Sequence, residues 1–182
     1  MSENYWNPVP TAQEIVRAYG VDHLWFGGKW AERNWRNVPG PFYGAMTDTC
    51  WTGRMDAPDH VAYDDRGGEF VYRQPRTPDE VRLIVAAADA DPVAGYGWDG
   101  DDHWTVQSVR DWWAARDRVR AWAVESARHR TDSGSAAAED AADGLHDYIA
   151  YIDGDLERDL RRYMFWLDQR RAPLPGEPLP EL

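Results

Sequence analysis

Apolar side chains recur every three or four positions over roughly thirty residues near the C-terminus of this chain. This spacing is typical of a helix that buries one face. Two glycines, Gly144 and Gly154, interrupt the pattern, and each costs a helix up to about 1 kcal/mol relative to alanine. The pattern therefore predicts one kinked helix or two helices that meet near Gly154. The apolar positions are Ala141, Leu145, Tyr148 or Ile149, Ile152, Leu156, Leu160, Tyr163 or Met164, and Leu167.

Two further helices are expected before this segment. Thr77-Pro78-Asp79-Glu80 is typical of a helix start, because threonine caps helices, proline suits the first turn and acids favour the N-terminal end of the helix dipole. A longer helix is expected from about Trp104 to Arg128, where valines and tryptophans recur at steps of three and four. Helices are therefore expected to dominate the second half of the chain.

The pattern changes after Pro39-Gly40-Pro41, a sequence that breaks any regular element. Short stretches rich in β-formers follow it, and Asp64 to Gly68 is expected to turn the last two of them into a hairpin. These stretches are 42–46, 49–52, 61–63 and 69–73.

Strands that are followed by helices, without regular alternation, indicate an α+β fold. We expect a small antiparallel β region, about 42–74, packed against long C-terminal helices. Residues 1–171 are expected to form a single domain, and residues 172–182, with four prolines, a Pro-rich C-terminal tail.

Two amino-acid types limit the class of protein. Eleven tryptophans in 182 residues are a large aromatic content, and we expect most of them in the core. The single cysteine, Cys50, excludes an intramolecular disulfide and an iron–sulfur cluster, which needs about four thiolates. Residues 1–10 lack the features of a signal peptide, and no apolar run reaches the roughly 18 residues of a membrane span. A cytoplasmic location is therefore expected.

The chain is strongly acidic, with 32 Asp and Glu against 20 Lys and Arg and a formal net charge of −12. Such a surface would repel nucleic acid and anionic membranes, and it favours a basic protein as partner. The acids concentrate between Asp132 and Asp159, where nine acids stand against one base. The alternative is that these acids only form a helix face that is exposed to water. The expected partner-binding residues are Asp140, Asp143, Asp147, Asp155 and Asp159.

One loop combines carboxylates with an imidazole and could bind a ligand or a metal. Its candidate residues are Asp99, Asp101, Asp102 and His103. Their spacing is not that of a calcium-binding loop. The alternative is that Asp101 or Asp102 caps the helix that follows.

Two more loops carry candidate chemistry. Asp48 and Cys50 form one of them, with His60 nearby as a base for a thiolate nucleophile, while an inert buried thiol is the alternative. Asp64, Asp65 and Glu69 surround the expected hairpin turn, where carboxylates can perform acid–base chemistry or simply form a polar tip. The usual dinucleotide, phosphate-loop, zinc-protease and nucleophile-elbow motifs are absent.

Six short motifs are spread over most of the chain. They are Asn37-Val-Pro-Gly-Pro-Phe-Tyr-Gly44, Thr47-Asp-Thr-Cys-Trp-Thr-Gly53, Glu69-Phe-Val-Tyr-Arg-Gln-Pro75, Asp99-Gly-Asp101, His103-Trp-Thr105 and Trp112-Trp113. Together they resemble an uncharacterised family of small acidic proteins from GC-rich bacteria. Some members carry the label "ferredoxin", which the single Cys50 contradicts chemically. The resemblance implies no activity and no catalytic residue.

Small size, acidity and missing catalytic motifs are also features of bacterial immunity proteins. We therefore expect an acidic protein-binding module, of immunity or inhibitor type, that docks a basic partner. The alternative is an enzyme or small-ligand binder whose site joins the three carboxylate-bearing loops, with room for a divalent metal and no other cofactor predicted. A third interpretation is a nucleic-acid mimic, which needs the C-terminal acids on one continuous face. The sequence leaves the oligomeric state open.

Overall fold

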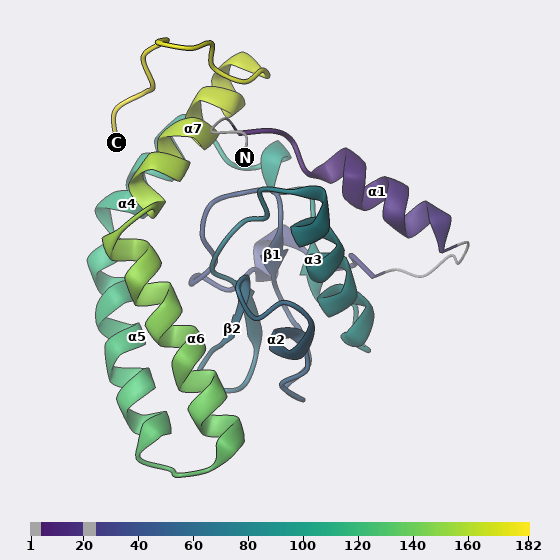
Figure 1. The fold of residues 1–182 in the computed structure, drawn as a ribbon, viewed down its shortest axis with the longest axis vertical. Helices are drawn as coiled ribbons and strands as arrows, with labels where there is room; N and C mark the ends of the chain where they lie inside the picture. Colours follow the sequence, from purple (N-terminus) through teal and green to yellow (C-terminus); the bar gives the residue numbers. More distant parts are fainter. Residues whose placement is uncertain (1–4, 20–24) are drawn as a thin grey trace.

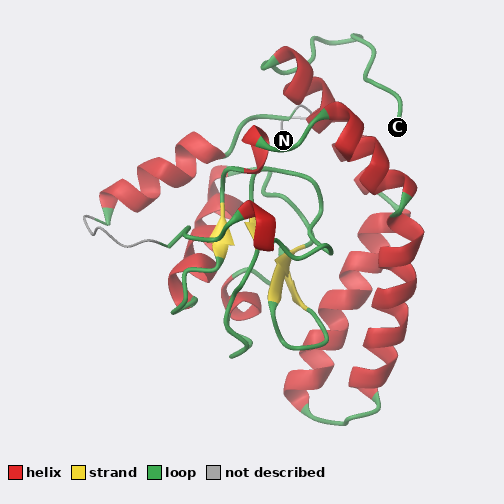
Figure 2. Ribbon diagram, turned by 180° about the vertical axis from the view of Figure 1, so that it is seen from behind, coloured by secondary structure: helices red, strands yellow, loops and turns green. Residues whose placement is uncertain are grey.

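The computed structural model describes residues 5–19 and 25–182, and within them helices and a few short strands form an α+β fold. The helices are α1 (Val9–Ala18), α2 (Gly53–Asp56), α3 (Pro78–Ala90), α4 (Val106–Ala114), α5 (Arg116–Thr131), α6 (Ala136–Asp153) and α7 (Leu156–Gln169). The strands are β1 (Tyr43–Gly44), β2 (Val61–Tyr63), β3 (Glu69–Val71) and β4 (Tyr96–Gly97). The strands lie between the C-terminal helices and α3, which confirms the expected β region packed against long helices (Figures 1 and 2).

The apolar spacing near the C-terminus belongs to two helices, α6 and α7, that meet at Gly154 as expected. The predicted helix from 104 to 128 is also two helices, because the chain departs from helical geometry at Ala115, between α4 and α5. Thr105 caps α4, and its Oγ1 accepts a hydrogen bond from the Ser108 backbone N–H at 3.1 Å. The expected cap at Asp101 or Asp102 is wrong, since both acids lie in a separate 3-10 turn, η2 (Gly100–Asp102).

Four strands form two antiparallel pairs, of which the sequence predicted one. β2 pairs with β3, with Ala62 opposite Phe70, which confirms the hairpin. β1 pairs with β4, which lies outside the expected 42–74 region. The strand expected at 49–52 is wrong. Trp51 has a φ of 63°, in the left-handed region that a strand does not use, and the chain bends there into α2.

One buried side chain, Asn37, joins the two strand pairs. Its Nδ2 donates to the Gly44 carbonyl at 2.8 Å. Its Oδ1 accepts from the backbone N–H groups of Gly44, at 2.9 Å, and of Val71, at 2.8 Å. Asn37 thereby supplies the hydrogen bonds that β1 and β3 do not make with each other, and the buried backbone groups stay paired.

Buried side chains form two clusters, and tyrosine rather than tryptophan occupies their deepest positions. The larger cluster joins the C-terminal helices to β2 and β3, and the smaller one lies around α1, α3 and β4. Of the eleven tryptophans, Trp25 and Trp104 are buried and seven more are partly buried against the two clusters, so most of them contribute to the core from its edge rather than from its interior. Several of the others lie at the boundary and stack on arginines: the Arg36 guanidinium is 4.0 Å from the Trp122 ring centroid.

The Pro-rich segment 172–182 runs over the C-terminal helices as a strap. Arg161 of α7 donates to the Pro180 carbonyl at 2.9 Å, and Arg110 of α4 donates to the Glu181 carbonyl at 2.8 Å. Leu182 packs against the larger cluster. Among the residues that the structure describes, no helix combines the length and the apolar character needed to cross a bilayer.

Candidate functional site

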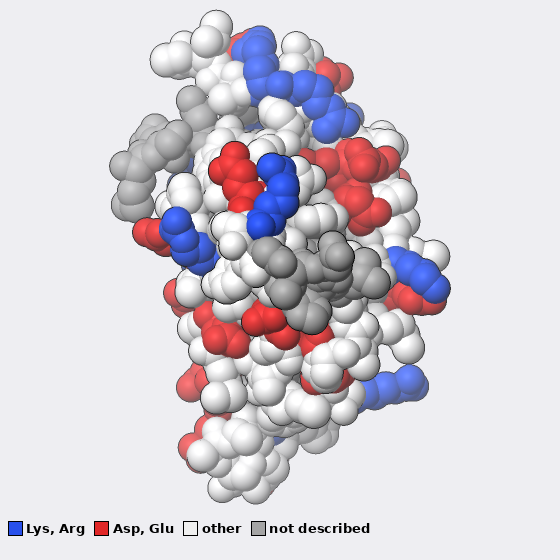
Figure 3. Space-filling model, turned by 90° about the vertical axis from the view of Figure 1, so that its right-hand side faces the viewer, with Lys and Arg blue, Asp and Glu red and all other residues white. Residues whose placement is uncertain are grey.

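The outer face of α6 carries three of the acids expected to bind a partner. Asp140, Asp143 and Asp147 stand at positions i, i+3 and i+7, which places them on one side of the helix. Their side chains are 57%, 75% and 54% exposed. On the side of the molecule that carries α1 and α3, by contrast, acidic and basic side chains are interspersed (Figure 3). We call these three residues the α6 acidic face.

Arg54 of α2 lies directly behind the α6 acidic face, with its side chain 5% exposed. Its guanidinium approaches Asp140 Oδ2 at 3.4 Å and Asp147 Oδ2 at 3.8 Å, and its Nη1 donates to the Pro58 carbonyl at 2.6 Å. A Cβ at Gly144 would lie 2.6 Å from Nη1, so glycine is what leaves room for Arg54 against the helix. Each carboxylate uses Oδ2 for this contact, which leaves its Oδ1 for a donor from outside.

The other two acids of the expected partner-binding set lie elsewhere. Asp155 stands just before α7 and pairs with Arg158 at 2.9 Å. Asp159 is 19% exposed and points into a cleft. The five acids therefore do not form one continuous surface.

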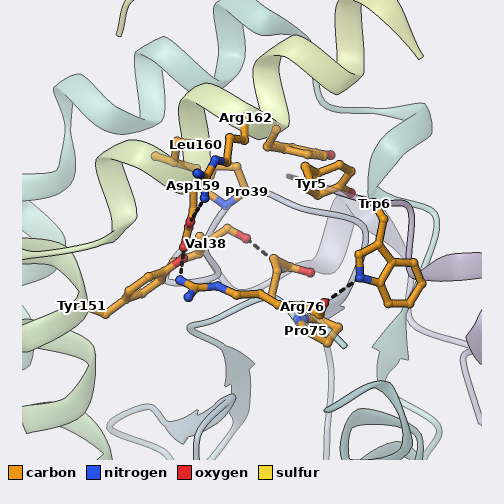
Figure 4. A pocket seen from close by; sticks show the side chains of 12 residues that line it. Tyr5, Trp6, Val38, Pro39, Pro75, Arg76, Tyr151, Asp159, Leu160 and Arg162 are labelled. Atoms are coloured by element: carbon orange, nitrogen blue, oxygen red, sulfur yellow. Dashed lines mark hydrogen bonds and ion pairs between the residues drawn. The ribbon is translucent and has the colours of Figure 1, made fainter. Parts of the chain in front are cut away.

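The cleft lies where the N-terminal segment meets the junction of α6 and α7 (Figure 4). Asp159 is held there by the Tyr151 hydroxyl, which donates to Oδ2 at 2.8 Å, and by an ion pair with Arg76. Trp6 closes one side, and its Nε1 donates to the Arg76 carbonyl at 2.6 Å. Arg162 completes the lining from α7. The cavity measures about 60 Å³, room for a few waters or a small chemical group, since one water needs about 10 to 15 Å³.

In the loop that runs from Asp99 to His103, the two end residues contact each other and their neighbours. Asp99 Oδ1 accepts from the Tyr43 hydroxyl at 2.6 Å, and its Oδ2 lies 3.2 Å from His103 Nε2. The His103 ring stacks on Trp30 with 4.8 Å between centroids. This pair therefore ties the loop to its neighbours.

Asp101 and Asp102, the other two acids of that loop, differ in their environment. Asp101 Oδ1 accepts from the Tyr163 hydroxyl of α7 at 2.7 Å, whereas Asp102 is exposed. Across residues 5–19 and 25–182, no three or more His, Cys, Asp and Glu side chains are arranged to hold a metal ion. Asp101 thus anchors the loop to α7.

Cys50 is exposed, so the expectation of a buried thiol is wrong. Its backbone N–H donates to Asp48 Oδ1 at 3.0 Å, and a hydrogen bond to the Asp48 carboxylate raises the pKa of the Cys50 thiol. A raised pKa disfavours the nucleophilic thiolate. His60 is buried, with Nδ1 2.9 Å from the Arg73 carbonyl. The geometry therefore gives no support to a Cys–His nucleophile.

Asp64 and Asp65 make internal contacts at the hairpin turn. Asp64 Oδ1 accepts from the Gly68 backbone N–H at 3.0 Å. Asp65 Oδ1 accepts from Trp122 Nε1 at 2.9 Å and from the Ser126 hydroxyl at 2.8 Å, both on α5. The hairpin touches the Asp48–Cys50 loop through Glu69, whose backbone N–H donates to Thr47 Oγ1 at 2.7 Å, whereas the carboxylates of Asp64 and Asp65 bind within the turn and to α5.

Glu69, at the start of β3, is fully buried. Its Oε1 accepts from the Gly53 backbone N–H at 2.8 Å, and its Oε2 accepts from the Tyr96 hydroxyl at 2.5 Å. Burial raises the pKa of Glu69 to about 7, although both hydrogen bonds favour the ionised form. Because none of its surface reaches solvent, we assign it a pH-sensitive structural role.

Comparisons with family models, with curated proteins and with solved structures found no match to this chain. Geometry and charge are therefore the basis on which a function is assigned. They offer two surfaces: the exposed α6 acidic face and the small cleft around Asp159.

Proposed function

We propose that this chain is an acidic protein-binding module, of immunity or inhibitor type, that docks a basic protein on the α6 acidic face. The observation that carries the proposal is the trio of exposed carboxylates with Arg54 behind two of them. Carboxylates that are already held in place lose less freedom when a partner binds, which favours affinity. Complementary charge also speeds association and selects the partner, and the net charge of −12 adds long-range attraction.

The other interpretations of the acids have less support. A nucleic-acid mimic needs one unbroken line of carboxylates, whereas Asp159 lies in the cleft. An enzyme built from the three loops needs their carboxylates to converge, whereas Asp65, Asp99 and Asp101 bind different parts of the fold. The direct alternative is that these acids only keep the outer face of α6 hydrated, and this alternative predicts no partner.

Affinity capture tests the proposal. Purified protein is immobilised and exposed to a lysate of its source organism at low and at high salt, and any stoichiometric partner is identified and produced. We expect a basic protein that is retained at low salt and released at high salt, because salt screens exposed charges. The dissociation constant is then measured by calorimetry with the purified partner.

A matched pair of variants locates the interface. Asp143→Arg reverses the charge of the most exposed acid of the face without touching Arg54, and we expect at least a tenfold loss of affinity, since like charges repel across an interface. Asp89→Arg changes the net charge equally at an exposed position of α3 and should leave the affinity within about twofold. Equal effects of the two variants, or no stoichiometric partner at low salt, would contradict the proposal.

A further inference from the structure

The cleft at the junction of α6 and α7 contains a guanidinium whose donors are largely unused. Arg162 is 21% exposed, so most of its side chain is out of bulk water. Within the described part of the chain its one polar contact is the 3.9 Å approach of Nη1 to Asp159 Oδ1, which is longer than a hydrogen bond. A guanidinium has five N–H donors, and leaving them unpaired away from water is costly. These donors are therefore available to a group that enters the cleft.

The charge of the cleft favours an anion. Two guanidiniums, those of Arg76 and Arg162, line it against the one carboxylate of Asp159. Asp159 Oδ2 is engaged by Arg76 and by the Tyr151 hydroxyl, and its Oδ1 approaches Arg162 only to 3.9 Å, so this single carboxylate does not balance both guanidiniums. The cleft therefore keeps one positive charge inside a protein that is acidic as a whole.

The remaining lining fits a short apolar body. Tyr5, Trp6, Pro39 and Pro75 present aromatic and proline surfaces around the guanidiniums (Figure 4). The cavity measures about 60 Å³, less than half of the roughly 150 Å³ of a protein cavity known to bind benzene. An aliphatic group of two or three carbons is therefore the right size, and an aromatic ring is too large for the enclosed part.

We infer that this cleft binds the terminal carboxylate of a short aliphatic acid, with Arg162 pairing with the carboxylate and the apolar lining covering the carbon chain. The planar fork of a guanidinium matches the two oxygens of a carboxylate. A phosphate would need more donors than one unpaired guanidinium offers, and it has no apolar body to place against Trp6. The same chemistry is found in a free short-chain acid and in the C-terminus of a peptide.

A titration with sodium propionate, followed by NMR at the Trp6 indole N–H, tests this inference. Trp6→Phe identifies that resonance among the eleven indoles. We expect a saturable shift with a dissociation constant in the millimolar range, since a ligand this small makes few contacts. No saturable shift at much higher concentration, or an equal shift with phosphate at matched ionic strength, would overturn the inference.

Variants at arginine separate binding from a general effect of charge. Arg162→Met keeps the length of the side chain and removes its donors, so we expect propionate to bind at least tenfold more weakly. Arg162→Lys should retain part of the affinity because it keeps the charge. Arg128→Met, an exposed arginine at the end of α5, removes the same charge far from the cleft and should bind like wild type. Unchanged binding in Arg162→Met would refute the assignment.

Two peptides distinguish the sources of the carboxylate. A trialanine with a free C-terminus and its C-terminally amidated form are titrated in the same way. Binding of the free form alone extends the site to peptide C-termini, and binding of propionate but of neither peptide restricts it to free acids. Both outcomes support a carboxylate site. Equal binding of the amidated and the free peptide would contradict it, because the amide has no charge for Arg162.

Discussion

One apolar spacing runs through helices α6 and α7, yet the acids of the two helices lie in different environments. α6 has five acids and no Lys or Arg, whereas α7 has three acids and three arginines. Asp143 of α6 is 75% exposed, and Asp159 of α7 is 19% exposed between Tyr151 and Arg76. A run of acids in a sequence is thus not one surface, because the break at Gly154 directs part of it to solvent and part of it into a cleft.

Glu69 extends this comparison to a fully buried carboxylate that forms no ion pair with any residue that the structure describes. Burial raises its pKa to about 7, from an ordinary value of 4.5. Between these two values the native state retains a proton that the unfolded chain has released, so stability falls as pH rises through this window and then levels off. At about 1.4 kcal/mol for each pKa unit, the loss through this group is about 3 kcal/mol.

Glu69→Gln should abolish that loss, because the amide is neutral at every pH. We expect the stability of wild type to fall relative to that of the variant by about 3 kcal/mol between pH 4.5 and pH 7.5, measured by urea unfolding. Taking the difference between the two proteins removes the contribution of other groups, such as His60, whose pKa burial lowers. Glu14→Gln, at an exposed position of α1, is the control and should show no such difference. A constant difference across this pH range would show that Glu69 is ionised in the native protein.

The difference between Asp159 and Asp143 predicts that replacing Asp159 destabilises the protein, whereas replacing Asp143 does not. Asp159→Ala leaves the Tyr151 hydroxyl and the Arg76 guanidinium without their acceptor, and we expect a loss of about 2 kcal/mol in the free energy of unfolding. Asp143→Ala should change stability by less than about 0.5 kcal/mol, because its carboxylate is mostly in water. Both are measured by urea unfolding at pH 7. Similar losses of stability for the two variants would mean that Asp159 and Asp143 do not lie in different environments.

Local signals in the sequence were sufficient for much of the fold. The Thr77 cap and the Asp64–Gly68 turn act over a few residues, and both were predicted correctly. The break at Ala115 has no such signal, because alanine is a good helix former. The pair of β1 with β4 was not predictable either, since two strands of two residues join positions about fifty residues apart. Elements that depend on distant partners leave little trace in composition or periodicity.

The candidate sites likewise include residues that a local pattern relates and residues that only distant parts of the chain bring together. The sequence grouped Asp140, Asp143 and Asp147 with two later acids, and only these three, spaced i, i+3 and i+7, share one helix face. The cleft was not predictable, because its lining comes from the N-terminal segment, the chain before α3 and both C-terminal helices. Arg54 falls just after a stretch that was expected to be a strand. One signal pointed to it: a glycine inside a helical pattern, Gly144, often marks the close approach of another group.

Gly144→Ala is the smallest effect and the one that bears most directly on the α6 acidic face. In an ordinary helix the change would stabilise by about 1 kcal/mol. Here the new Cβ would lie 2.6 Å from Arg54 Nη1 and displace a guanidinium that donates to the Pro58 carbonyl, which costs about 2 kcal/mol. We therefore expect a net loss of about 1 kcal/mol, measured by urea unfolding.

In an Arg54→Ala background the same substitution should instead stabilise by about 1 kcal/mol, because the obstructing group is gone. The double-mutant cycle thus isolates the contact between the guanidinium and the helix. Equal stabilisation in both backgrounds would show that Arg54 is not seated against Gly144. Asp140 and Asp147 would then lose the support that distinguishes them from ordinary solvated acids, and the case for a preorganised docking face would rest on charge alone.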